Sequence, residues 1–395
     1  MTTVIGMLNK KGIALAADSA VTITRGSQRK VYNTANKIFA LSKYNPIGVA
    51  IYNGAEFMGT PWEILIKEYR RQITEKSFTT LEEYKKDFFN WLKLNDYFTN
   101  EEKSRKYLNA EFAFFVQEVI ISLKKTVTKT TVTNEILEKE FEKAILRIEK
   151  NFEVLENFKD FSGDRLKDLL KNEELGKATK LLSNAFQIMF ALDDLLIEMF
   201  HAYVIRNGFI LFTGLVFSGY GTEDLFPQLL PVNVSLVIDE QLRYCDDKDK
   251  EIRINADSNI GNIASFAQTD VANTILHGIS PWLDKVAEQT VGKVVSKLVS
   301  SQLGGMSNAA MQKLKDTVSK EFRVEIDEGI KRKYTNPFLS ALGQLSNTDL
   351  AEMSESLVYL TCLKRRFTLA EENVGGPVDV AVITKDDGFV WVKKK

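Results

Sequence analysis

The sequence predicts an α+β fold with antiparallel strands at both ends of the chain and long helices between them. Two short apolar runs, 3–8 and 13–17, flank Asn9-Lys10-Lys11-Gly12, a pattern typical of a β-hairpin with a glycine-containing turn. A second hairpin is predicted near the far end, where an apolar run is followed by Asp387-Gly388. Between residues 76 and 206, apolar residues recur at helical spacing and proline is absent.

Composition places the chain among globular proteins and excludes several functional classes. Its 395 residues are 44% hydrophobic, which is enough for a substantial core, and the net charge of −1 gives no argument for nucleic acid or an anionic membrane. Cys245 and Cys362 are expected to be free thiols, and no spacing of ligand residues predicts a metal or cofactor. No segment reaches the roughly 18 apolar residues of a membrane helix. No signal peptide is recognisable, so we expect a cytoplasmic protein.

The first residues suggest a nucleophile. Removal of Met1, expected because threonine is small, would leave Thr2 with both a hydroxyl and a free α-amine. A folded N-terminal amine titrates at about 7.7–8.0, so a useful fraction is neutral at cytosolic pH and can accept the hydroxyl proton. The chain contains only His201 and His277, which leaves little material for a histidine-based triad.

An acid and a lysine stand at the ends of strands expected to flank the N-terminal strand. The second apolar run ends in Asp18, and Lys37 precedes the strand-like Ile38-Phe39. A further apolar run, 47–52, follows. The sequence therefore predicts that Asp18 and Lys37 lie near Thr2.

These residues resemble the proteasome β-subunits and their bacterial relatives, which are N-terminal-nucleophile threonine hydrolases. Asp18 follows Thr2 by sixteen residues, as in that family, and Lys37 stands where the family lysine falls. The resemblance implies that Thr2 is the nucleophile, that Asp18 holds Lys37, and that the Ile51 amide binds the oxyanion where the family usually has glycine. The segment 375–390 looks like the closing Gly-Gly and Asp-Val-Ala-Val-Ile hairpin of the family.

Two further positions follow from the same resemblance. The family places a serine near the catalytic amine in a turn that enters a helix, and this role is assigned to Asn262, with Ser258 and Ser265 as neighbours. An Asp of the family that contacts the amine corresponds to Glu371, with Glu372 as a close rival. The family's nearby serine becomes Val374.

The resemblance implies a four-layer αββα sandwich, the N-terminal-nucleophile hydrolase fold, with large helical insertions. Residues 1–75, 207–279 and 345–395 are assigned to the proteasome-like core, 76–206 to a helical insertion and 280–344 to a second one.

The leading functional hypothesis is a cytoplasmic proteasome-like threonine endopeptidase acting on polypeptides or peptides. The resemblance also implies a ring-like homo-oligomer and an ATPase unfoldase as a possible partner. A second hypothesis keeps the fold but assigns a small amide as substrate, because Ile51 and the insertions could close the cleft. A third is an inactive scaffold subunit, because Asn262, Glu371 and Val374 depart from the family.

Overall fold

The chain forms a mixed α/β structure with antiparallel sheets. The computed structural model describes residues 2–25, 28–95, 100–127, 132–257, 260–302, 307–368 and 374–395. The strands are β1 (Thr3–Asn9), β2 (Gly12–Asp18), β3 (Val21–Arg25), β4 (Gln28–Tyr32), β5 (Ile38–Ala40), β6 (Ile47–Tyr52), β7 (Glu56–Phe57), β8 (Thr60–Pro61), β9 (Thr213–Gly219), β10 (Gln228–Ile238), β11 (Gln241–Asp246), β12 (Ile252–Arg253), β13 (Asn262–Ala267), β14 (Val378–Thr384) and β15 (Gly388–Lys393).

The described helices form two blocks in the chain, one between β8 and β9 and one between β13 and β14. They are α1 (Trp62–Ile73), α2 (Leu81–Lys93), α4 (Glu101–Thr126), α5 (Asn134–Asn151), the 3₁₀-helix η1 (Glu156–Phe158), α6 (Gly163–Leu169), α7 (Asn172–Phe186), α8 (Asp193–Val204), α9 (Asp270–His277), α10 (Pro281–Gln302), α11 (Asn308–Ile330), the π-helix η2 (Lys331–Thr335), α12 (Asn336–Gln344) and α13 (Asn347–Phe367).

Both hairpins predicted at the chain ends are present and lie in one sheet. Its strand order is β13-β1-β2-β14-β15, so the first and last segments of the chain pair directly. Val378 is paired with Asp18, and Thr3 with Ala267. Because of this pairing, β1 begins, β2 ends and β14 begins at the same end of the strands in this sheet.

The second sheet has the order β11-β10-β9-β6-β5, with β12 paired to β10. Ile38 is paired with Ala50, which places Lys37 just before the start of β5. The segment after β2 contributes strands β3 and β4, which pair with each other. Residues 26–27 lie outside the described residues.

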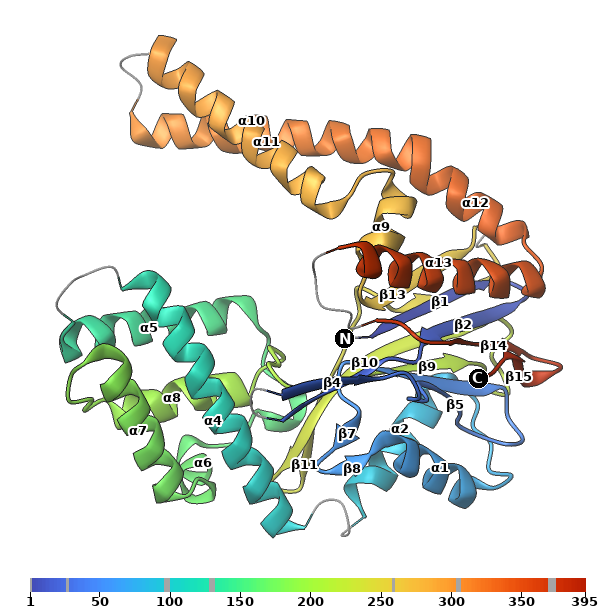
Figure 1. Cartoon of the computed structure of the whole chain (residues 1–395), viewed down its shortest axis with the longest axis horizontal. Coiled ribbons are helices and arrows are strands. Elements are labelled where there is room, and N and C mark those ends of the chain that lie inside the picture. The colour runs from blue at the N-terminus through green and yellow to red at the C-terminus, as the bar shows by residue number, and fades with distance from the viewer. Residues whose placement is uncertain are drawn as a thin grey trace.

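Successive side chains of β1 point to opposite faces of its sheet, so this strand contributes to two separate layers of the core. Val4 and Leu8 pack against residues of the second sheet, whereas Ile5 and Met7 pack against α13. The outer face of the second sheet packs on α1 and α2; for example, Phe217 lies 5.7 Å from Phe88 between ring centroids. Figure 1 shows the two sheets between these helices.

The inserted helices differ in extent from the sequence expectation. Residues of α2 contact β9, β10 and β11, so this helix covers the sheet beside α1 and belongs with the core. Residues of α12 contact β1 and β13 and also belong there. The helices that extend away from the sheets are α4 to α8 on one side and the pair α10–α11 on the other (Figure 1).

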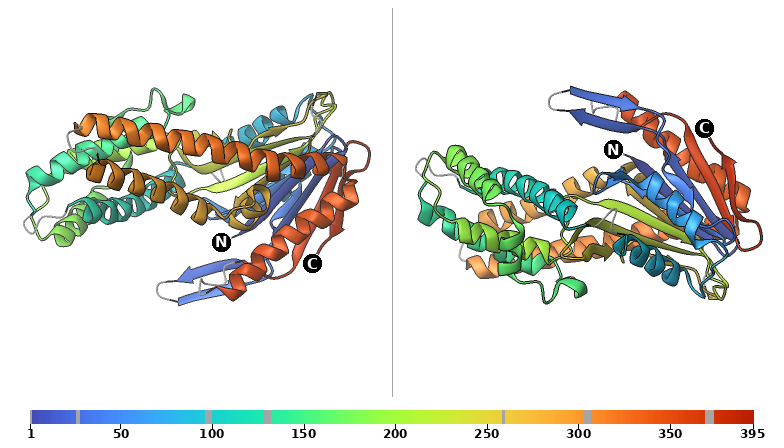
Figure 2. Two further views of the ribbon diagram at one scale, coloured as in Figure 1. Left: turned by 90° about the horizontal axis from the view of Figure 1, so that it is seen from above. Right: turned by 90° about the horizontal axis from the view of Figure 1, so that it is seen from below.

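Both groups of inserted helices project to the same end of the molecule. The views from above and below show α10–α11 and α4–α8 extending beyond the sheets in one direction (Figure 2). The start of β1 faces that end as well (Figures 1 and 2).

Within the described part of the chain, no helix combines the length and apolar character needed to cross a membrane.

Candidate active site

Thr2 lies immediately before β1 and is almost enclosed by the fold. Its residue surface is 8% exposed, and its carbonyl oxygen accepts a hydrogen bond of 3.3 Å from the backbone N–H of Gln268. The alternation of β1 places Thr2 on the face of Val4 and Leu8, toward the second sheet. This is the sheet from which Lys37 approaches.

Asp18 is the group that connects the start of β1 with Lys37. Its Oδ1 accepts hydrogen bonds from the Thr3 N–H at 2.8 Å and from Lys37 Nζ at 2.7 Å. Its Oδ2 accepts from the N–H groups of Ala20 at 3.2 Å and Gly375 at 3.1 Å. The carboxylate is 1% exposed and is therefore compensated by four donors from separate segments.

Lys37 is a buried cation held by that single carboxylate. The residue is 5% exposed. Burial lowers the pKa of Lys37 below its ordinary value of 10.5, an effect opposed by the Asp18 carboxylate and reinforced by the Lys395 ammonium. A lysine with a lowered pKa keeps a positive charge on the carboxylate that also binds the Thr3 N–H, and it gives up a proton more readily than an exposed lysine does.

The predicted oxyanion donor differs in the structure. The Ile51 N–H is not open to a substrate, because it donates a 2.8 Å hydrogen bond to the Lys37 carbonyl oxygen. The reason is the register of β5 and β6: Ile38 pairs with Ala50, so the next residues, Lys37 and Ile51, bond across the end of the ladder. The assignment of Ile51 as a free oxyanion donor is therefore corrected.

The structure also places Asn262 away from the nucleophile. Asn262 pairs with Leu8 at the far end of β1, which is about 20 Å along the strand from Thr2 at roughly 3.3 Å per residue. The turn that enters α9 begins instead at Ala267, whose φ of 63° is left-handed. Gln268 is thus the residue beside Thr2, and Asn262 is excluded from the role predicted for it.

Sequence reasoning missed Gln268 because it aligned the wrong end of β13. The usable signal was the polar stretch Gln268-Thr269-Asp270, which directly precedes the helical pattern of α9. The Gln268 side chain is fixed by Arg365 of α13, which donates to Gln268 Oε1. Lys364 forms an ion pair of 2.8 Å with Asp270, so α13 holds this turn at two points.

Glu371 and its rival Glu372 lie outside the described residues, as does Ser258. Ser265 lies inside β13. Val374 is described and is 2% exposed, and the following residue, Gly375, donates to Asp18.

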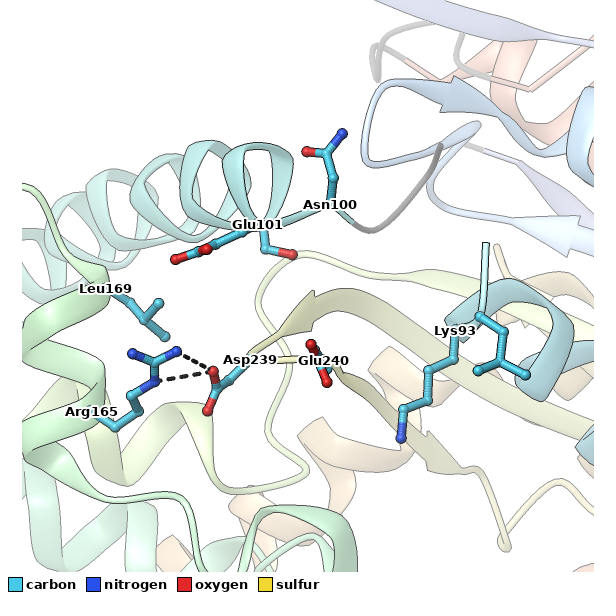
Figure 3. Close-up of a pocket in the computed structure, with 9 residues that line it drawn as sticks. Lys93, Asn100, Glu101, Arg165, Leu169, Asp239 and Glu240 are labelled. Carbon is cyan, nitrogen blue, oxygen red and sulfur yellow. Dashed lines mark hydrogen bonds and ion pairs between the residues drawn. The ribbon is translucent and has the colours of Figure 1, made fainter. Parts of the chain in front are cut away.

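A separate cavity of about 420 Å³ lies between the inserted helices and the β10–β11 turn. Arg165 of α6 reaches across it to form an ion pair with Asp239 (Figure 3). Asp239 and Glu240 both have positive φ values, 48° and 62°, as a two-residue hairpin turn requires. The residues that line this cavity include none of Thr2, Asp18 and Lys37.

Among the described residues, no group of three or more His, Cys, Asp or Glu side chains is arranged to hold a metal ion. Comparison with protein-family models and with curated proteins finds no match to this chain. The functional assignment therefore rests on the geometry of Thr2, Asp18 and Lys37.

Proposed function

We propose that this protein is a cytoplasmic threonine-type hydrolase that cleaves peptide bonds with Thr2, after removal of Met1, as its N-terminal nucleophile. The observation that carries the proposal is the position of Asp18, whose Oδ1 bonds both the Thr3 N–H and Lys37 Nζ. One buried oxygen thus joins the backbone N–H of Thr3, the residue that follows the proposed nucleophile, to the only side-chain cation that it binds among the described contacts.

The arrangement of layers supports the same proposal. α13 packs on the outer face of the sheet containing β1, the two sheets face one another, and α1 and α2 pack on the far side. We interpret this order as the four-layer αββα sandwich of N-terminal-nucleophile hydrolases, with residues of both chain ends forming the catalytic edge.

In the proposed reaction, Thr2 Oγ attacks the carbonyl carbon of the scissile amide. The hydroxyl proton passes to the α-amine of Thr2, directly or through water, and then to the leaving amine as the C–N bond breaks. The acyl group remains as an ester on Thr2 until water attacks it and releases the acid. Lys37 stabilises the developing alkoxide, and its charge favours the neutral form of the amine.

The test compares Thr2→Ala with Thr2→Ser in a panel of fluorogenic peptides and small amides. Thr2→Ala removes the nucleophile and is expected to abolish turnover, whereas Thr2→Ser keeps a hydroxyl and retains measurable activity. Turnover of peptides identifies the endopeptidase, and turnover of small amides alone identifies the small-amide hydrolase. Equal turnover in wild type and Thr2→Ala would contradict the mechanism.

One observation favours a second candidate, an inactive scaffold of the same fold. The Ile51 N–H is already bonded to the Lys37 carbonyl, so the donor assigned to the oxyanion is occupied. A scaffold would show no turnover and no covalent adduct with any member of the panel. A ring-like homo-oligomer fed by an ATPase unfoldase is part of the leading proposal, and assembly without activity would fit the scaffold.

A further inference from the structure

The helical pair α10–α11, here called the arm, has no role in the proposed catalytic site. No side chain described in α10 or α11 is buried, although the two helices pack along each other. Figure 1 shows the arm extending well beyond the sheets. A two-helix hairpin of this kind buries too little apolar surface to be well ordered alone, so its outer apolar face needs a partner.

Three exposed apolar residues of the arm form one stripe along α10, whereas Trp282 of α10 and Val324 of α11 are exposed outside it. Leu283 is 48% exposed, Val294 is 48% exposed and Leu298 is 51% exposed. Their spacing of eleven and four residues keeps them on one face of the helix, and Ala287 and Thr290 lie on the same face. The stripe runs along most of α10 on a face that α11 leaves exposed.

This stripe matches itself when a second α10 is laid against it in the opposite direction. Leu283 lies seven positions before Thr290, and Leu298 lies seven positions after Val291. Ala287 and Val294 are placed in the same way, three positions from this centre. A two-fold axis between Thr290 and Val291 therefore sets Leu283 opposite the Leu298 of a second copy, and small Ala287 opposite Val294.

The charge of the arm is self-complementary in the same direction. The half nearer the sheets, 281–290 with 320–330, contains three more acidic than basic residues: Asp284, Glu288, Glu321, Glu325, Asp327 and Glu328 against Lys285, Lys320 and Arg323. The outer half, 291–302 with 308–319, contains three more basic than acidic residues: Lys293, Lys297, Lys313 and Lys315 against Asp316. Antiparallel arms thus place opposite charges together, whereas parallel arms place like charges together.

We propose that the arm is a homotypic interface, in which α10 of one chain packs antiparallel against α10 of a second copy to form a four-helix bundle. The occupant is a second copy because the apolar stripe is symmetric about one point and the net charges on the two sides of that point are opposite. The proposal is independent of the chemistry assigned to Thr2.

The first test measures the mass of the full-length protein by light scattering across about 1–100 µM. We expect an even number of 44.8 kDa chains, and half that number in the double variant Leu283→Glu/Leu298→Glu. Burial of two carboxylates per chain should weaken association by at least about 100-fold. Val324→Glu is the matched control, because Val324 is 49% exposed but lies on α11, and it should assemble as wild type does.

The second test fixes the direction of packing by disulfide formation in a variant with Cys245 and Cys362 replaced by alanine. Thr290→Cys lies beside the proposed axis and should cross-link to itself. Leu298→Cys should not do so alone, but it should cross-link to Leu283→Cys when the two chains are mixed. A monomer at every concentration, an assembly unchanged by Leu283→Glu/Leu298→Glu, or self-cross-linking of Leu298→Cys would overturn the proposal.

Discussion

At the scale of single residues, the central feature is a buried ion pair whose two members are supported unequally. Among the residues that the structure describes, Asp18 accepts hydrogen bonds from three backbone N–H groups besides Lys37, whereas Lys37 Nζ has one acceptor, Asp18 Oδ1. Removing either partner leaves the other charge buried, but the carboxylate keeps most of its donors. The two halves of the pair should therefore differ in their effect on stability.

Asp18→Asn is expected to lower the free energy of unfolding by about 3–5 kcal/mol, because it leaves the buried Lys37 ammonium without a counter-charge and turns an amide NH₂ toward groups that are themselves donors. Lys37→Met is expected to lower it by about 1–3 kcal/mol, because Asp18 keeps its three N–H donors. Urea unfolding of both variants measures the difference. A larger loss of unfolding free energy in Lys37→Met than in Asp18→Asn would contradict the conclusion that Asp18 is the better stabilised member of the pair.

The lowered pKa of Lys37 makes a prediction about pH. Between the folded pKa and the ordinary value of 10.5, the unfolded chain binds more protons at this position than the folded chain does. The contribution of Lys37 to stability therefore improves as pH rises through that window and is least favourable below it. The unfolding free energy of wild type minus that of Lys37→Met should rise toward pH 10.5, and a flat difference would contradict the buried position of the ammonium.

The sequence predicts well that Asp18 lies close to the start of β1, for a simple reason. Thr2 and Asp18 belong to one hairpin, so their spacing along the chain fixes their positions, and the pairing Val4–Ala17 brings Asp18 beside Thr3. The roles assigned to Asn262 and Ile51 depended on finer details of the structure. The first required the exact end of β13, and the second required the direction of an N–H group, which is set by the register of two strands.

At the scale of elements, hairpin periodicity predicted β1, β2, β14 and β15, but the contacts of the inserted helices were not readable. These helices are joined to the sheet by Arg243 of β11, which is fully buried and donates to the backbone carbonyls of Val204, Tyr203 and Arg206 at the end of α8. Glu111 of α4 lies 3.8 Å from the same guanidinium. Nothing in the spacing of these residues along the chain marks them as partners.

Arg243→Met is expected to destabilise the protein by about 3–5 kcal/mol, because it removes the Arg243 donors from three carbonyls and leaves Glu111 without a cation. The Tyr203 carbonyl keeps a hydrogen bond of 3.3 Å from the Arg206 N–H. Arg165→Met is the matched control: its ion pair with Asp239 also joins an inserted helix to this sheet but is half-exposed, so the loss should stay under about 1 kcal/mol. Thermal or urea unfolding compares the two. Similar losses in both variants would contradict the role assigned to burial.

At the scale of the whole molecule, the pattern of helices and strands predicted an α+β core interrupted by two helical insertions. It did not predict that α2 and α12 would pack on the core, because amphipathic helices look the same whether they cover a sheet or another helix. The sequence also could not show that both insertions project to the end where β1 begins (Figure 2). Under the proposed function, a substrate would approach Thr2 from the end of the molecule where both insertions project (Figure 2).

The most direct measurement of the central claim is the intact mass of the purified protein before and after treatment with a threonine-directed epoxyketone or β-lactone. The account predicts a chain that has lost Met1 and gains one adduct, mapped to Thr2 and absent from Thr2→Ala. A chain that retains Met1 and gains no adduct would contradict it, because the amine that serves as base would then be blocked.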